Sequence, residues 1–190
     1  MSAGRSFRSA GLSHVGLVRS TNEDAWLARP DIGLWAVADG MGGHARGDVA
    51  SATIVSALAR LPAPADARGH LHGVETALKA AHAELQRLAA GTCDICGSTV
   101  AVLLAFDRHF AVLWAGDSRV YRLRAGRLEL LTRDHTLVQA MVDQGQLPPE
   151  AARLHPLRNR ITRALGMPGP LELERCQGEI RPNDMFLLCT

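Results

Sequence analysis

The stretch of sequence that decides the fold reads NEDAWLARPDIGLWAVADG and covers residues 22–40. It contains a short strand-like segment over residues 25–28, a turn with Pro, Asp and Gly over 30–33, and a continuous apolar run over 34–38. Two such segments on either side of a turn predict a β-hairpin. The unbroken apolar run predicts that its second strand is buried on both faces.

Two aspartates lie at equal distances from the predicted turn. Asp24 stands just before the first strand of the hairpin and Asp39 just after the second, and their numbers average to the centre of the turn. In that register they are directly opposed, which places their Cβ atoms about 4.5–5.5 Å apart. Carboxylates held this close repel each other, so we expect a cation between them. Mg²⁺ and Mn²⁺ are suitable because they prefer oxygen ligands.

Two further residues fit a site for a phosphoester. Gly40 has no Cβ, so its backbone carbonyl could approach a cation closely. Arg19 lies upstream, and its planar guanidinium can bind a phosphate through two hydrogen bonds. An alternative interpretation stays open: the two aspartates cap turns, Gly40 begins a flexible corner, and Arg19 is a surface charge.

The rest of the chain alternates between helical and strand patterns. Apolar residues at three- and four-residue steps predict helices over 47–61 and 73–88. A helix is also expected over about 137–144, and a short one beginning at the prolines 148 and 149. Further strands are expected over 13–18, 98–106, 110–115, 120–124, 127–131, 171–176 and 185–189. This order favours an α+β fold of antiparallel sheets with helices on a face.

Composition excludes several classes of protein. The net charge of +2 is too small to argue for nucleic-acid binding. No apolar stretch reaches the roughly 20 residues that span a bilayer. Residues 1–10 are polar and lack the apolar core of a signal peptide. We therefore expect a cytoplasmic protein that binds neither nucleic acid nor membrane.

Five motifs occur in order along the chain. They are SHVGLVRSTNED (13–24), VADGMGGH (37–44), GSTV (97–100), AGDSR (115–119) and TRDHT (132–136). Together they resemble the bacterial type of the protein phosphatase 2C family, the metal-dependent serine/threonine protein phosphatases. The resemblance implies two antiparallel β-sheets packed as a sandwich with helices on the outer faces, in a single domain over residues 1–190. It also implies hydrolysis of phosphoserine or phosphothreonine by water activated by two Mn²⁺ or Mg²⁺ ions.

The resemblance assigns roles to individual positions. Asp39 would bridge both metal ions, and Gly40 would ligate through its carbonyl. Glu23 and Asp24 would act near the ions, directly or through water. Arg19 would bind the phosphate of the substrate, a phosphorylated protein supplied by an opposing serine/threonine kinase.

Other matched positions have supporting roles or two interpretations. Asp117 matches a carboxylate that the family uses for a third metal ion, and it could equally be a turn-forming aspartate between two strands. Thr99 and Ser118 are expected to support the fold. Residues 136–160 would form the flap, a mobile segment beside the active site, with His135 and Arg163 helping to fix its ends.

Residues 181–190 resemble the strand that leads into the family's next metal motif, and the sequence ends before that motif. The resemblance implies another Asp-Gly motif and a later aspartate ligand, and neither occurs before residue 190. We therefore expect a domain that is incomplete at its C-terminus. The alternative function is a pseudophosphatase or fragment that binds a phosphoprotein or partner without hydrolysing it.

Overall fold

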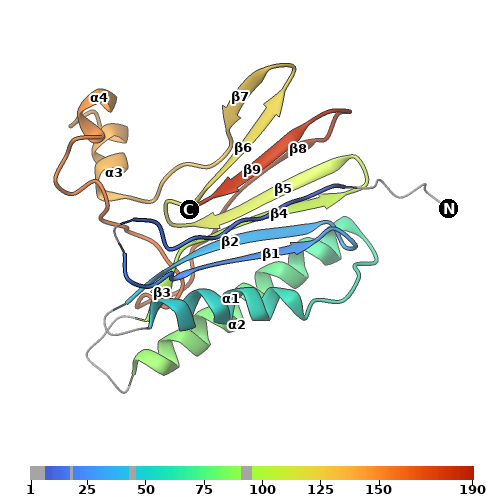
Figure 1. Ribbon diagram of the computed structural model, residues 1–190, viewed down its shortest axis with the longest axis horizontal. Helices are drawn as coiled ribbons and strands as arrows, with labels where there is room; N and C mark the ends of the chain where they lie inside the picture. The colour runs from blue at the N-terminus through green and yellow to red at the C-terminus, as the bar shows by residue number, and fades with distance from the viewer. Residues whose placement is uncertain (1–6, 18, 43–45, 91–95) are drawn as a thin grey trace.

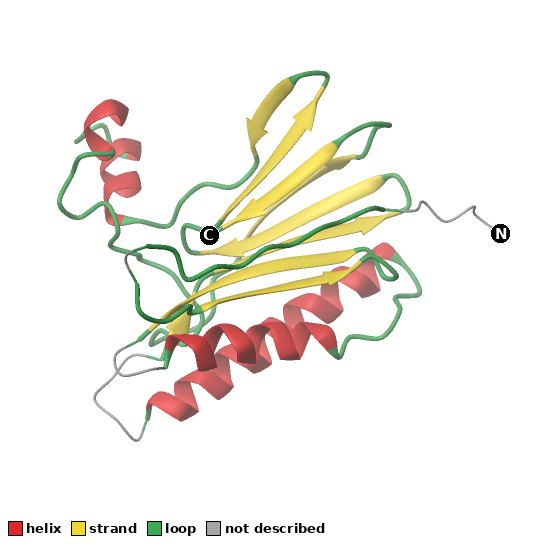
Figure 2. Ribbon diagram, in the orientation of Figure 1, coloured by secondary structure: helices red, strands yellow, loops and turns green. Residues whose placement is uncertain are grey.

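Two antiparallel sheets packed against each other form the body of the protein. The computed structural model describes residues 7–17, 19–42, 46–90 and 96–190. Figure 1 shows the sheets as two layers, with a pair of long helices below the larger one. The predicted α+β sandwich is thus confirmed. In the described part of the chain, its helix layer lies on the larger sheet, as the colouring of Figure 2 makes plain.

Six strands form the larger sheet and three form the smaller one. The larger sheet has the order β1 (Asp24–Arg29), β2 (Leu34–Met41), β4 (Val100–Phe106), β5 (His109–Ala115) and β8 (Glu174–Glu179), and the short β3 (Gly97–Ser98) also pairs with β2. The smaller sheet has the order β7 (Arg127–Leu130), β6 (Arg119–Arg124) and β9 (Met185–Cys189). The chain passes from one sheet to the other between β5 and β6.

Two long helices cover the outer face of the larger sheet. They are α1 (Gly47–Ala59) and α2 (Ala67–Ala89), and α1 packs on β1 and β2. The second helix begins six residues earlier than its apolar pattern predicts. Asp66 explains the difference, because its carboxylate accepts a hydrogen bond from the Gly69 amide at 2.6 Å and so caps the helix.

Each central strand contributes to two hydrophobic cores. In β4, residues 100, 102 and 104 pack toward the helices, whereas 101, 103 and 105 pack toward the smaller sheet. The run over 34–38 behaves in the same way: Leu34 faces the helices, and Trp35 belongs to the core between the sheets. This two-sided burial explains why these strands are apolar without interruption.

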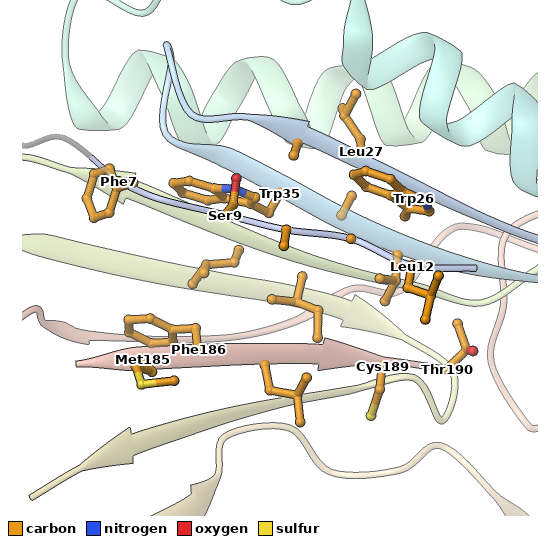
Figure 3. Close-up of a pocket in the computed structure, with 18 of the residues that line it drawn as sticks. Phe7, Ser9, Leu12, Trp26, Leu27, Trp35, Met185, Phe186, Cys189 and Thr190 are labelled. Atoms are coloured by element: carbon orange, nitrogen blue, oxygen red, sulfur yellow. The ribbon is translucent and has the colours of Figure 1, made fainter. Parts of the chain in front are cut away.

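The N-terminal segment differs from its sequence pattern. Residues 13–17 form no strand, and Val18 lies outside the described residues. Residues 7–13 instead line a groove of about 600 Å³ between β1, β2 and β9. Figure 3 shows Phe7, Trp26 and Trp35 along one side and Phe186 along the other. Phe7 meets Trp35 edge to face at 5.3 Å between ring centroids, so ring contacts hold this segment in place of a β-ladder.

The helices are shorter or more polar than a membrane span would have to be. No helix in the described ranges combines the length and apolarity needed to cross a bilayer.

One buried histidine makes the stability of the fold sensitive to pH. His70 on α2 is 4% exposed, and neither of its ring nitrogens has a hydrogen-bond partner among the described residues. Burial lowers the pKa of His70, because the charged ring would lose its hydration. Below about pH 6.5 the unfolded chain therefore takes up a proton that the folded chain resists, and stability falls.

We expect His70→Leu to weaken the loss of stability between pH 7.5 and pH 5.5. The leucine removes a buried polar ring that must stay neutral in the folded state. Thermal unfolding of the protein and the variant at both pH values measures the effect. His72→Leu is the matched control, because that neighbouring side chain is exposed. An equal pH dependence for His70→Leu and the unchanged protein would contradict the expectation.

Candidate active site

The hairpin of β1 and β2 brings the two predicted aspartates together. Asp24 is the direct partner of Asp39 in the antiparallel register, as the symmetry about the turn predicts. Side chains alternate between the faces of a strand, so Asp39 shares the face of Val37 and Trp35, which pack toward the smaller sheet. The two carboxylates therefore open toward the smaller sheet, on the side of the larger sheet opposite α1 and α2.

The charges of the predicted site meet at Asp39. The pKa of Asp39 is raised to about 6, first by burial and then by the negative charges of Asp24, Asp117 and Glu23. Arg19 acts in the opposite direction, as a positive charge that favours the ionised form. Four residues, three of them from positions 19–24 and the fourth Asp117, thus lie close enough to act on one carboxylate. The arrangement is an anionic centre with one adjacent cation.

A set of hydrogen bonds holds the backbone of Asp39. Its amide donates to Thr99 Oγ1 at 3.2 Å, and its carbonyl accepts from the Thr99 amide at 2.9 Å and from Ser98 Oγ at 3.0 Å. Thr99 Oγ1 also lies 2.7 Å from Ser118 Oγ, and both side chains are buried. The expected supporting role of Thr99 and Ser118 is confirmed, and they join Asp39 to the loop that carries Asp117.

Gly40 allows the hairpin to approach the start of α1. A Cβ at this position would lie 1.9 Å from the Gly47 carbonyl oxygen and 2.8 Å from that of Glu23. The Glu23 carboxylate lies against Gly47 in turn, since a Cβ there would be 2.6 Å from Glu23 Oε1. Glu23 therefore contributes its charge from the N-terminus of α1, where a helix favours an anion.

The loop between the two sheets places Asp117. Gly116 has φ +114°, and a Cβ there would lie 2.5 Å from the Thr99 side chain, so this corner favours glycine. Burial raises the pKa of Asp117. Next to it, Arg119 forms two hydrogen bonds with Asp134, at 2.9 and 2.6 Å. That ion pair ties the start of β6 to the residues that precede the flap.

The ends of the flap, residues 136–160, are tied together at its base. Thr136 forms a β-bridge with Ile161, and the His135 carbonyl accepts a hydrogen bond from the Thr162 amide at 2.8 Å. Helices α3 (Leu137–Asp143) and α4 (Pro149–Ala152) form the flap beyond this closure. They stand apart from the two sheets in Figure 1.

His135 and Arg163 hold the base of the flap, as the sequence predicts. His135 Nδ1 accepts a hydrogen bond from the Gly116 amide at 3.1 Å, and its Nε2 lies 3.2 Å from Glu174 Oε1. Arg163 donates to the same oxygen at 3.0 Å. Sequence reasoning missed Glu174, because only the pairing of β8 with β5 brings it opposite Trp114 and next to the flap.

The end of β9 also reaches the acidic pair. The Thr190 hydroxyl donates a hydrogen bond to Asp24 Oδ2 at 3.2 Å. This contact joins the smaller sheet to the hairpin of the larger one. The acidic centre therefore lies where both sheets end, between the hairpin, the Asp117 loop and the last strand.

The oxygen atoms at this centre suit a divalent cation. Asp24 and Asp39 repel each other, and a cation would relieve the cause of the raised Asp39 pKa. Within the described ranges, no three His, Cys, Asp or Glu side chains are close enough to hold an ion by themselves. The fit is therefore to an ion that takes further ligands from a backbone carbonyl such as Gly40 and from water, as Mg²⁺ commonly does.

The sheets and this centre define an α+β sandwich protein with an acidic site suited to hard divalent cations. The chain belongs to the protein phosphatase 2C family, whose family model matches residues 10–153. Over 185 residues it is 38% identical to the serine/threonine protein phosphatase PstP of Mycobacterium tuberculosis. That match covers 96% of this chain and 35% of PstP, so the chain spans about a third of the length of this curated relative.

Solved structures give the same fold. A structure described as PppA, a key regulatory component of T6SS in Pseudomonas aeruginosa, is 44% identical, with a TM-score of 0.88 over 96% of this chain and 76% of that chain. The catalytic domain of the serine/threonine protein phosphatase PstP, in complex with two manganese ions, is 34% identical. Its TM-score is 0.78, over 93% of this chain and 74% of that chain.

Removing the Asp39 charge should stabilise the metal-free protein. A carboxyl whose pKa is raised from 3.8 to about 6 favours its neutral form in the folded state, so its ionisation destabilises the fold as the pH rises through this window. We expect Asp39→Asn to increase the free energy of unfolding at pH 7.5 by on the order of 1 kcal/mol, allowing for solvent screening, and by less at pH 4.

Denaturant unfolding in the presence of a chelator measures this difference. Asp31→Asn is the control, because Asp31 is exposed in the turn of the same hairpin and its carboxylate pairs with Arg29. That variant should give no gain in stability. A loss of stability in Asp39→Asn at pH 7.5 would show that the carboxylate is not strained by its neighbours.

Proposed function

We propose that this protein is a metal-dependent protein phosphatase that hydrolyses phosphoserine and phosphothreonine. The observation that carries the proposal is the convergence of Asp24, Asp117 and Glu23 on Asp39, with Arg19 beside them. An acidic centre of this kind calls for a cation, and the adjacent guanidinium suits a phosphate. Family membership and the manganese-bound relative support the same conclusion.

Some residues of the centre would bind the cations, and Arg19 would bind the substrate. Asp39, Asp24 and the Gly40 carbonyl would hold two Mn²⁺ or Mg²⁺ ions, with Glu23 acting directly or through water. Asp117 would serve a third ion. When bound, the ions supply Lewis acidity that makes water a nucleophile at neutral pH. The Arg19 side chain is exposed, so it can bind phosphate oxygens and orient the phosphorus toward that water.

In the overall reaction, water oxygen forms a bond to phosphorus and the bond from phosphorus to the serine or threonine oxygen breaks. The leaving oxygen takes a proton, so the products are inorganic phosphate and a free hydroxyl side chain. The natural substrates would be proteins phosphorylated by an opposing serine/threonine kinase in the cytoplasm. We propose that residues 1–190 act within one catalytic domain.

Mn²⁺-dependent hydrolysis of p-nitrophenyl phosphate tests the proposed activity. We expect the unchanged protein to release nitrophenolate only when Mn²⁺ is added, and Asp39→Asn to lose at least about 100-fold in rate, since it removes the central carboxylate. Asp31→Asn should keep the full rate. A folded protein that binds Mn²⁺ without turnover would instead support the pseudophosphatase alternative.

Metal binding can be measured without activity. A ligand that binds only the folded state stabilises it, and the gain in stability grows with the logarithm of the ligand concentration once that concentration exceeds Kd. We expect Mn²⁺ to raise the melting temperature of the unchanged protein and of Asp31→Asn, and to have little effect on Asp39→Asn. An equal increase in all three proteins would place the metal elsewhere.

A further inference from the structure

A second cavity lies between the flap and the smaller sheet. Its volume is about 470 Å³, and we call it the flap pocket. Its outer wall is formed by Arg153, Arg158 and Asn159 of the flap, and its inner wall includes Asp117 and Tyr121. The groove in Figure 3 is mainly apolar, whereas this cavity is lined mostly by polar and charged side chains.

The flap pocket adjoins the acidic centre. Asp117 lines the pocket and also acts on the pKa of Asp39. Thr190 lines it as well, and its hydroxyl donates to Asp24 at 3.2 Å. If the phosphorylated residue of a peptide lies at the acidic centre, the residues next to it in the peptide would therefore lie in or along this pocket.

The outer wall of the pocket carries uncompensated positive charge. On the inner wall Arg119 is neutralised by Asp134, to which it donates two hydrogen bonds. Arg153 and Arg158 form no ion pair with any described residue. In contrast, two arginines near the base of the flap are paired, Arg133 with Asp143 and Arg163 with Glu174. Two guanidinium groups of the pocket thus remain available to a ligand.

Neutral groups of the pocket can also donate to an anion. Tyr121 Oη accepts a hydrogen bond from Arg119 at 3.2 Å, which leaves its own O–H free to donate. The Asn159 side-chain amide offers two further N–H donors. A carboxylate, which only accepts hydrogen bonds when ionised, matches this set of donors.

We infer that the flap pocket binds acidic side chains next to the phosphorylated residue, so that the preferred substrates are phosphoproteins with Asp or Glu near the phosphorylation site. This inference rests on the proposed function for the position of the phosphate. Arg153 and Arg158 are the specificity-determining residues. They act from the flap, and the acidic centre itself is the same for all substrates.

Peptide binding tests the inference directly. Two fluorescein-labelled phosphothreonine peptides of equal length are compared by fluorescence anisotropy at low salt and without added Mn²⁺, so that neither is hydrolysed. One has three Glu on each side of the phosphothreonine and the other has three Gln. Exposed ion pairs are individually weak, so we expect about a three- to tenfold lower Kd for the Glu peptide. The preference should shrink at 0.5 M salt, where charges are screened.

Variants separate the pocket from the net charge of the protein. The double variant Arg153→Gln/Arg158→Gln should bind both peptides equally. Arg160→Gln is the matched control, because Arg160 is an exposed flap arginine that does not line the pocket, and it should keep the preference. The inference is overturned if neither peptide binds, if the Glu peptide is not preferred, if the double variant keeps the preference, or if the control also loses it.

Hydrolysis of p-nitrophenyl phosphate distinguishes a failure of this inference from a failure of the proposed function. That substrate is too small to reach across the flap pocket, so the double variant should hydrolyse it at the unchanged rate. Turnover of p-nitrophenyl phosphate without a Glu preference would support the proposed phosphatase activity and contradict the proposed role of the flap pocket. A Glu preference in a protein without turnover would support the flap pocket as an anion-binding site and contradict the proposed catalytic activity.

Discussion

The register between β1 and β2 is the constraint on which the rest of the structure depends. This register is set by the alternating direction of the side chains along β2. Every second side chain, from Leu34 through Ala36 to Ala38, is buried against the helices. A slip of one residue would turn this apolar set to the other face of the sheet, and it would also separate Asp24 from Asp39. Hydrophobic burial along the whole strand therefore fixes the geometry of two charged groups at its end.

The acidic centre is held together against its own repulsion. The negative charges around Asp39 oppose folding, as the direction of its pKa shift indicates. The opposing contribution comes from neutral hydrogen bonds: Ser98 and Thr99 hold the Asp39 backbone, and Thr99 reaches Ser118 beside Asp117. The buried hydroxyl pair connects the two sheets without adding charge. The repulsion at the centre destabilises the fold, and hydrophobic packing in the two cores on either side of the larger sheet offsets it. Functional sites are commonly stabilised in this way by the structure around them.

The sequence predicted those parts of the structure that depend on local pattern. The hairpin, its register and the two long helices follow from apolar spacing and turn residues within about 40 positions. Contacts between distant segments were harder to foresee. The apolar pattern predicted a strand over 171–176, but β8 begins only at Glu174. The position of β8 is decided by its pairing with β5. Residues 13–17 form no strand, and it is residues 7–13 that line the groove between the sheets, where Phe7 contacts the ring of Trp35. Glu174 carries no local signal for its contact with His135.

The closure at the base of the flap has a consequence for how such a protein can change. Because Thr136 and Ile161 are bridged, the chain leaves the sandwich and returns to it at nearly the same point. A segment with adjacent ends can be lengthened, shortened or replaced at little entropic expense, and no strand of either sheet has to move. The fold thus separates the two-sheet body, which holds the acidic centre, from a segment that can be exchanged. A change of length or sequence in this segment would leave the acidic centre in place.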